Sequence, residues 1–137
     1  MEQPLDFMQK RRRRRSGDPA LATRYQLDQV LRDFDLSCCL IVDDSADVVA
    51  TAPEYPTPMM RRMAGLLPTF ASSGRPRKSH LQIICGTHDP DLGADEVTAC
   101  VFRAGGRRHY IGAVGPEAVM NELAIFRAII GVRRILK

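Results

Sequence analysis

The 137-residue sequence lacks the long hydrophobic segments that membrane insertion or secretion requires. No apolar run approaches the roughly 18 residues that a membrane-spanning helix needs. The first residues, Met1 to Pro4, do not begin the apolar stretch of a signal peptide. We therefore expect a cytoplasmic protein, and the length is that of a single domain.

Complete catalytic motifs are also missing. The complete glycine-rich phosphate-binding motif, G-x-x-x-x-G-K-S/T, is absent, and no grouping of serine, histidine and acidic residues stands out. The half site Cys85-x-x-His88 has no matching second half. The sequence therefore predicts neither an enzyme nor a bound metal or other cofactor. The side chains considered as metal ligands are His80, Cys85, His88, Cys100 and His109.

The acidic loops lack the order of alternating ligands, central glycine and final glutamate that binds calcium. We interpret their carboxylates as turn residues, at Asp43, Asp44, Asp47, Asp89, Asp91 and Asp95. The chain has four cysteines but no Cys-x-x-Cys pair. Because each lies in an apolar run, we expect them to be reduced and buried. They are Cys38, Cys39, Cys85 and Cys100.

The excess positive charge lies at one end of the chain. The first 15 residues carry six basic and two acidic side chains, which accounts for the whole net charge of +4. Consecutive arginines repel one another, so we expect residues 1–17 to form a flexible basic arm. It is a solubilising tail, or it binds an anionic partner, a membrane or nucleic acid. Its arginines are Arg11, Arg12, Arg13, Arg14 and Arg15.

Turn and capping residues predict where the elements begin. Aspartate and serine at 43–47 favour a turn between two strands, which predicts a hairpin over residues 37–52. The pairs Asp18-Pro19 and Thr57-Pro58 predict helix starts. Pro68 should kink the second helix or end it early. A third strand is predicted at 80–86.

The remaining residues predict a second hairpin and a final helix. Glycines near residue 105 favour a tight turn within 96–114, and Pro116 marks the start of the helix. Its apolar stripe is broader than one packing face needs. One side carries Val119, Leu123, Phe126 and Ile130, and the next carries Ile125, Ile129, Val132 and Leu136.

The predicted order of elements is α-β-β-α-β-β-β-α. It predicts an α+β fold with a single five-stranded antiparallel sheet and helices on its faces. This order resembles the roadblock/dynein light chain family, which has a profilin-like fold. The resemblance is carried by the strand, acidic turn and strand over 40–51, by Met63-Ala64-Gly65-Leu66-Leu67, and by the hairpin and helix from Val97 onward. The resemblance implies that residues 18–137 form one interaction domain.

The resemblance implies a cytoplasmic homodimer or heterodimer with no catalytic residues. Bacterial members of the family commonly bind and regulate small Ras-like GTPases. Members pair through the middle helix and the third strand. Pro68 and the arginine run depart from the family pattern. Carried over to this chain, the dimer interface would include Met60, Met63, Leu67, Leu81, Ile83 and Cys85.

Two other functions remain open. The stretch from Val101 to Arg107, followed by Tyr110 to Val114, also resembles the core hairpin of GAF-type small-ligand sensors. An enclosed pocket of several hundred Å³ would favour that function. The third alternative is an adaptor that binds an anionic membrane or nucleic acid through the arginine arm. Activation, nucleotide exchange and scaffolding are equally open for the first function.

Overall fold

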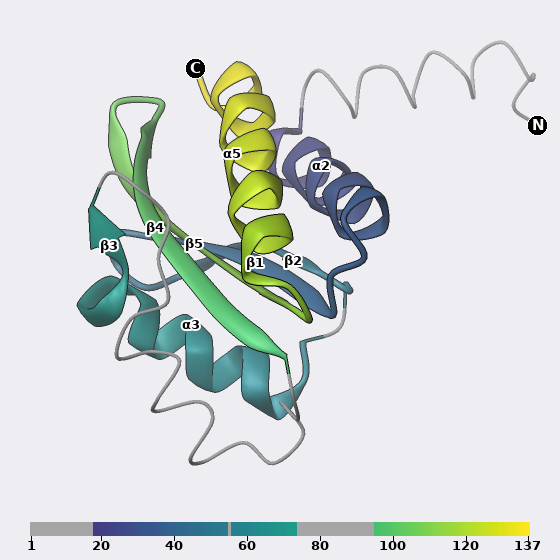
Figure 1. Ribbon diagram of the computed structural model, residues 1–137. Helices are drawn as coiled ribbons and strands as arrows, with labels where there is room; N and C mark the ends of the chain where they lie inside the picture. Colours follow the sequence, from purple (N-terminus) through teal and green to yellow (C-terminus); the bar gives the residue numbers. More distant parts are fainter. Residues whose placement is uncertain (1–17, 55, 74–94) are drawn as a thin grey trace, which may run out of the picture.

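The computed structural model describes residues 18–54, 56–73 and 95–137 (Figure 1). Within these ranges the chain forms an α+β domain in which three helices pack on one sheet. The strand order is β2-β1-β5-β4-β3. The elements are α2 (Pro19–Asp33), β1 (Cys38–Asp43), β2 (Val48–Ala52), α3 (Pro58–Phe70), β3 (Ser72–Ser73), β4 (Glu96–Ala104), β5 (Arg107–Gly115) and α5 (Ala118–Ile135).

The four longer strands pair antiparallel, as the sequence predicts. The described sheet also contains a short strand that the sequence pattern does not predict. Strand β3 has two residues and runs parallel to β4. The predicted strand at 80–86 lies outside the described residues, so the sheet of five antiparallel strands is not confirmed.

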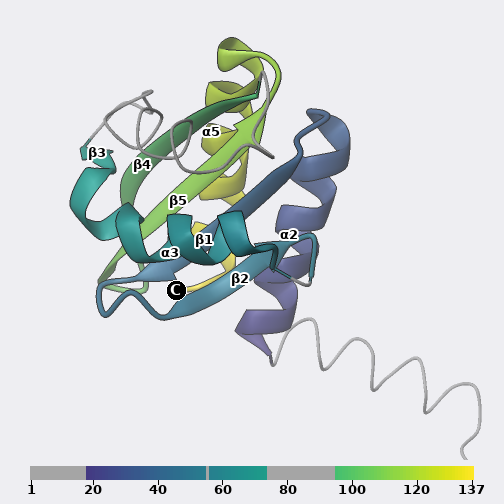
Figure 2. The same cartoon turned by 90° about the horizontal axis from the view of Figure 1, so that it is seen from below.

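The sheet is covered on both faces (Figures 1 and 2). Helix α3 crosses one face, and α2 and α5 lie side by side on the other. Because successive strand residues point to opposite faces, β1 supplies both layers. Cys39 and Ile41 join the core under α2 and α5, whereas Leu40 and Val42 join the core under α3. Its continuous apolar sequence follows from this double coverage.

The two helix starts predicted from a capping residue and a proline are confirmed, whereas the final helix begins at Ala118, two residues after Pro116. The side chain of Asp18 accepts a hydrogen bond from the Leu21 N–H at 3.3 Å. The hydroxyl oxygen of Thr57 accepts one from the Met60 N–H at 3.2 Å. Each cap satisfies a backbone donor that the first helical turn leaves free, and proline follows directly in both helices.

Pro68 does not end α3 immediately, since the helix continues to Phe70. A proline lacks the N–H that would bond the carbonyl four residues earlier. Here that loss falls in the last turn, and the Ala71 N–H donates to the Leu67 carbonyl at 2.9 Å. None of the helices in the described ranges is long and apolar enough to cross a membrane.

Candidate interaction surfaces

Three residues of the predicted dimer interface lie in the core. Met60, Met63 and Leu67 are at most 1% exposed and pack against the sheet. Contact with β5 is tight, because a Cβ at Gly112 would lie 3.2 Å from the Met63 sulfur and from a Leu67 methyl. These side chains are fully covered in the single chain. They therefore cannot supply the exposed surface on which a second subunit would pack.

The other predicted binding residues fall outside the described residues. These are Leu81, Ile83 and Cys85 of the expected third strand, and Arg11 to Arg15 of the basic arm. The dimer surface and the role of the arm thus stay predictions. The structure does show that α3 leads directly into β3, which forms one edge of the described sheet.

Helix α3 turns a second face to solvent. Arg62, Gly65 and Thr69 are exposed there, and Leu66 is half-buried beside them. We call these four residues the α3 outer face. Outside the backbone of α3 itself, no atom of the described residues lies within 4 Å of a Cβ placed on Gly65, so the helix backbone is accessible at that position. A missing side chain allows another backbone to approach closely.

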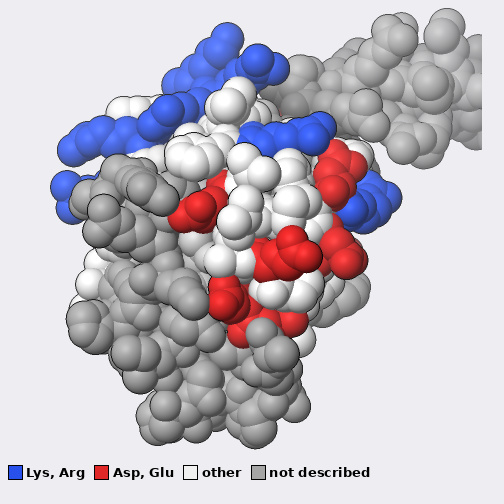
Figure 3. Space-filling model, in the orientation of Figure 1, with Lys and Arg blue, Asp and Glu red and all other residues white. Residues whose placement is uncertain are grey.

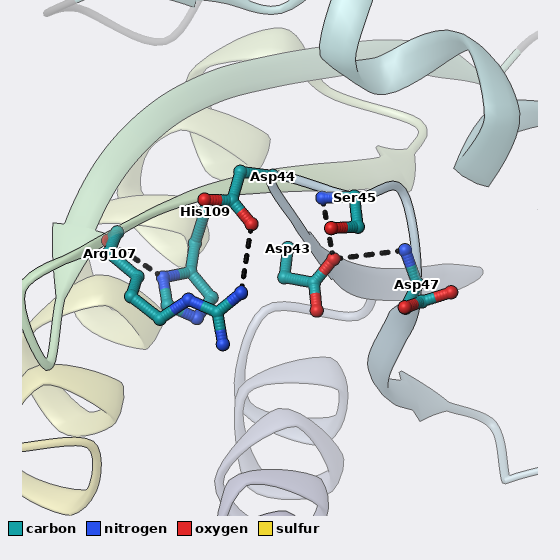
Figure 4. A network of polar contacts seen from close by, with 6 residues as sticks. All are labelled: Asp43, Asp44, Ser45, Asp47, Arg107 and His109. Carbon is teal, nitrogen blue, oxygen red and sulfur yellow. Dashed lines mark hydrogen bonds and ion pairs between the residues drawn. The ribbon is translucent and has the colours of Figure 1, made fainter.

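The acidic cluster of the first hairpin forms a turn, as predicted (Figure 4). One carboxylate oxygen of Asp43 accepts hydrogen bonds from the backbone N–H groups of Ser45 at 2.9 Å and Asp47 at 3.0 Å. Asp44 instead pairs with Arg107 of β5, at 3.1 Å. The carboxylate of Asp43 therefore shapes the hairpin, and that of Asp44 ties its tip to the next strand of the sheet.

His109 lies beneath this turn and is nearly buried. Its Nδ1 lies 3.1 Å from the Arg107 carbonyl oxygen, and its ring stacks on Phe102 with 5.4 Å between centroids. Both contacts hold the imidazole within the β4–β5 hairpin. In the described ranges, no three His, Cys, Asp or Glu side chains gather in a way that could hold a metal ion.

Three of the cysteines are free and buried, as expected: Cys38, Cys39 and Cys100. Burial raises the pKa of the Cys39 thiol, and the neighbouring Cys38 adds to the effect. Burial also raises the pKa of Cys100, and the positive charge of Arg133 opposes this in part. Thiolate is the reactive form of cysteine, so Cys39 and Cys100 act as packing side chains. Cys85 lies outside the described residues.

A groove of about 570 Å³ lies where the two hairpin turns meet the start of α2 and the end of α5. Asp43, Arg107 and His109 contribute to its wall, with Pro19 and Leu136 from the helices. It is open to solvent and not an enclosed cavity. A sensor domain normally surrounds most of its ligand. The shape of this groove therefore does not favour the GAF-type function.

Helix α5 exposes one of its two apolar stripes. Ala124, Ile125, Ala128, Ile129 and Val132 face the core. The other stripe is directed to solvent. Its members, which we call the α5 stripe, are Val119 (65% exposed), Leu123 (49%), Phe126 (47%) and Ile130 (56%). The unusual breadth of the apolar pattern in the sequence is thus explained by a second, uncovered face.

Comparison with known proteins gives a fold but no family assignment. No family model matches the sequence, and no curated protein matches it. Among solved structures, Myxococcus xanthus MglB is 12% identical with a TM-score of 0.50, covering 86% of this chain and 90% of its own. A structure described as MglB with tetrameric arrangement is 16% identical with a TM-score of 0.54, covering 87% and 90%.

At these identities the likeness concerns the fold alone. It extends over most of both chains, and it supports the roadblock-like architecture predicted from the order of the elements. Fold does not fix function, which must be argued from the surfaces that this chain presents.

Proposed function

We propose that this chain is a non-catalytic regulatory or scaffold module that self-associates and acts on a small Ras-like GTPase in the cytoplasm. The observation that carries the proposal is the roadblock-like fold, shared with MglB over 86–87% of the chain. The resemblance of the sequence to the roadblock family points to the same function. The tetrameric arrangement described for one of the MglB structures is consistent with self-association of this fold.

We place the dimer contact on the α3 outer face and the neighbouring edge of the sheet. This keeps the elements that the family resemblance names but exchanges the buried Met60, Met63 and Leu67 for exposed residues of the same helix. Gly65 offers a point of close helix approach, and arginine and partly exposed apolar side chains are common at interfaces. A twofold axis near Gly65 would bring the same face of both subunits together.

The GTPase function is tested by binding that depends on the bound nucleotide. The small Ras-like GTPases of the native cell are purified, loaded with GDP or with a non-hydrolysable GTP analogue, and passed over the immobilised full chain. We expect at least one of them to bind with affinities that differ on the order of tenfold between the two states, because a regulator must distinguish them.

A variant in which Arg11 to Arg15 are replaced by glutamine is the control for charge. If the arm only solubilises the chain, this variant binds the GTPase as the wild type does. If binding is lost, the arm belongs to the contact. Failure of every GTPase to bind in either state would contradict the proposed function.

A further inference from the structure

The α5 stripe is the largest row of exposed apolar side chains that the structure describes. Single exposed hydrophobic residues are common on protein surfaces, whereas contiguous ones mark an interaction site. None of the described elements covers the four members of the stripe. Figure 3 shows this face, with uncharged residues over α5.

The spacing within the stripe is that of a helix-packing seam. Its members follow one another at intervals of four, three and four residues. This is the pattern of the a and d positions along which two helices pack side by side. The pattern is also symmetric. In an antiparallel pair centred between Leu123 and Phe126, these two side chains lie opposite each other, and Val119 lies opposite Ile130.

The charges beside the stripe are separated along the helix. Glu117 at the N-cap and Glu122 lie toward the N-terminal end of α5, whereas Arg127, Arg133 and Arg134 lie in its C-terminal half. Arg127 also pairs with Asp33 of α2 at 3.1 Å, so Arg133 and Arg134 supply most of the net positive charge there. Figure 3 shows the same separation, with acidic residues toward one end of α5 and basic residues at the other. An anionic membrane would meet the acidic half unfavourably. A partner with the reverse order of charges would complement both halves.

We propose that the α5 stripe binds the α5 stripe of a second copy of this chain, with the two helices antiparallel. The twofold axis then sets the acidic half of each helix against the basic half of the other, and it covers all four apolar side chains. Helix α5 and helix α3 lie on opposite faces of the sheet. The contact is thus independent of the proposed dimer through α3. The two contacts together would link more than two chains, and they would close into a tetramer only where their twofold axes are perpendicular and intersect.

The first test measures mass by sedimentation velocity across a range of concentrations. Leu123→Glu places a charge in the centre of the stripe, and we expect the dissociation constant of this contact to rise on the order of 30-fold. Val48→Glu is the matched control, because Val48 is 53% exposed on β2 and lies outside the stripe. It should keep the wild-type mass. Equal masses for Leu123→Glu and the wild type would overturn the proposal.

The second test determines the direction of the helices. Chains carrying Val119→Cys are mixed with chains carrying Ile130→Cys, both with Cys85→Ser, and are oxidised mildly. An antiparallel pair forms a disulfide only in the mixture. In that pair two copies of position 119 would be about 16 Å apart, at 1.5 Å per residue. A disulfide from the Val119→Cys chain alone would overturn the antiparallel contact.

The two proposals can fail separately. Variants of the α3 outer face leave the α5 contact unchanged, because the two surfaces lie on opposite faces of the sheet. A chain that is dimeric and insensitive to Leu123→Glu would contradict only the α5 contact. A dimer that becomes monomeric with Leu123→Glu would support the α5 contact and contradict the one at α3.

Discussion

At the scale of single residues, Asn121 connects a helix to the sheet. Its side chain is fully buried, and its Nδ2 donates hydrogen bonds to the Glu96 carbonyl at 3.0 Å and the Gly115 carbonyl at 3.3 Å. Glu96 and Gly115 are partners in the ladder between β4 and β5. The amide therefore fixes the first turn of α5 to the ends of two strands.

Replacing Asn121 by alanine should lower the free energy of unfolding by about 1–3 kcal/mol, because the partly buried Glu96 carbonyl and the buried Gly115 carbonyl lose a donor. Urea denaturation followed by circular dichroism measures this change. Gln29→Ala is the control: Gln29 is exposed and bonds Asp33 of its own helix, so its effect should be within about 0.5 kcal/mol. Equal effects of the two substitutions would contradict a structural role for Asn121.

The sequence pattern predicts the local polar contacts of the helix caps, but it does not predict the hydrogen bonds of Asn121. Asp18 and Thr57 are predictable as helix caps because each bonds an N–H only three residues away. The partners of Asn121 lie 6 and 25 residues away in the chain, and they are backbone groups with no side-chain signature. Contacts that depend on tertiary packing leave no periodic signal in the sequence.

At the scale of elements, the β4–β5 turn shows how one hairpin and the final helix are coupled. Both turn glycines have positive φ, +60° at Gly105 and +75° at Gly106. They differ in their surroundings. A Cβ on Gly105 would lie 2.9 Å from the Leu136 carbonyl oxygen, whereas no described residue other than the two chain neighbours comes within 4 Å of a Cβ on Gly106. The end of α5 thus rests on the turn at Gly105.

Alanine substitutions at the two glycines should therefore have unequal effects. Each substitution costs about 1–2 kcal/mol for the left-handed backbone. Only Gly105→Ala also forces the chain at Leu136 to move, so it should reduce the melting temperature more than Gly106→Ala does. Thermal unfolding of both variants under one set of conditions measures the difference. If Gly106→Ala is equally or more destabilising, the contact with Leu136 has no role in stability.

The elements themselves are largely predictable from the sequence, but the face that each helix buries is not. The first hairpin, the glycine turn and both capped helix starts follow from local chemistry. Periodicity alone does not show whether an apolar stripe meets the core or a partner. In α3 the stripe of Met60, Met63 and Leu67 covers the sheet, and in α5 one of two stripes does so. The short parallel strand β3 has no local signal either.

At the scale of the whole molecule, the fold presents two separate surfaces. Helix α3 covers one face of the sheet and turns its outer face to solvent, while α5 exposes its stripe on the other side (Figure 2). A sheet covered on both faces keeps its own core closed. We therefore expect association with other chains to involve the outer faces of helices and the strand edge. This arrangement is consistent with the regulatory or scaffold function that we propose.

Two chains should meet at the α3 outer face, and cysteine cross-linking tests this central claim most directly. Gly65 is near the middle of α3, where two helices related by a twofold axis would cross. The chain carries Gly65→Cys together with Cys85→Ser. The thiols of Cys38, Cys39 and Cys100 are buried and should not compete. Gln29→Cys, exposed on α2, is the control in the same background.

Under mild oxidation, the Gly65→Cys chain should form a covalent dimer on a non-reducing gel, and the Gln29→Cys chain should stay monomeric. A Gly65→Cys chain that remains monomeric, or one that cross-links no better than the control, would contradict a dimer through α3.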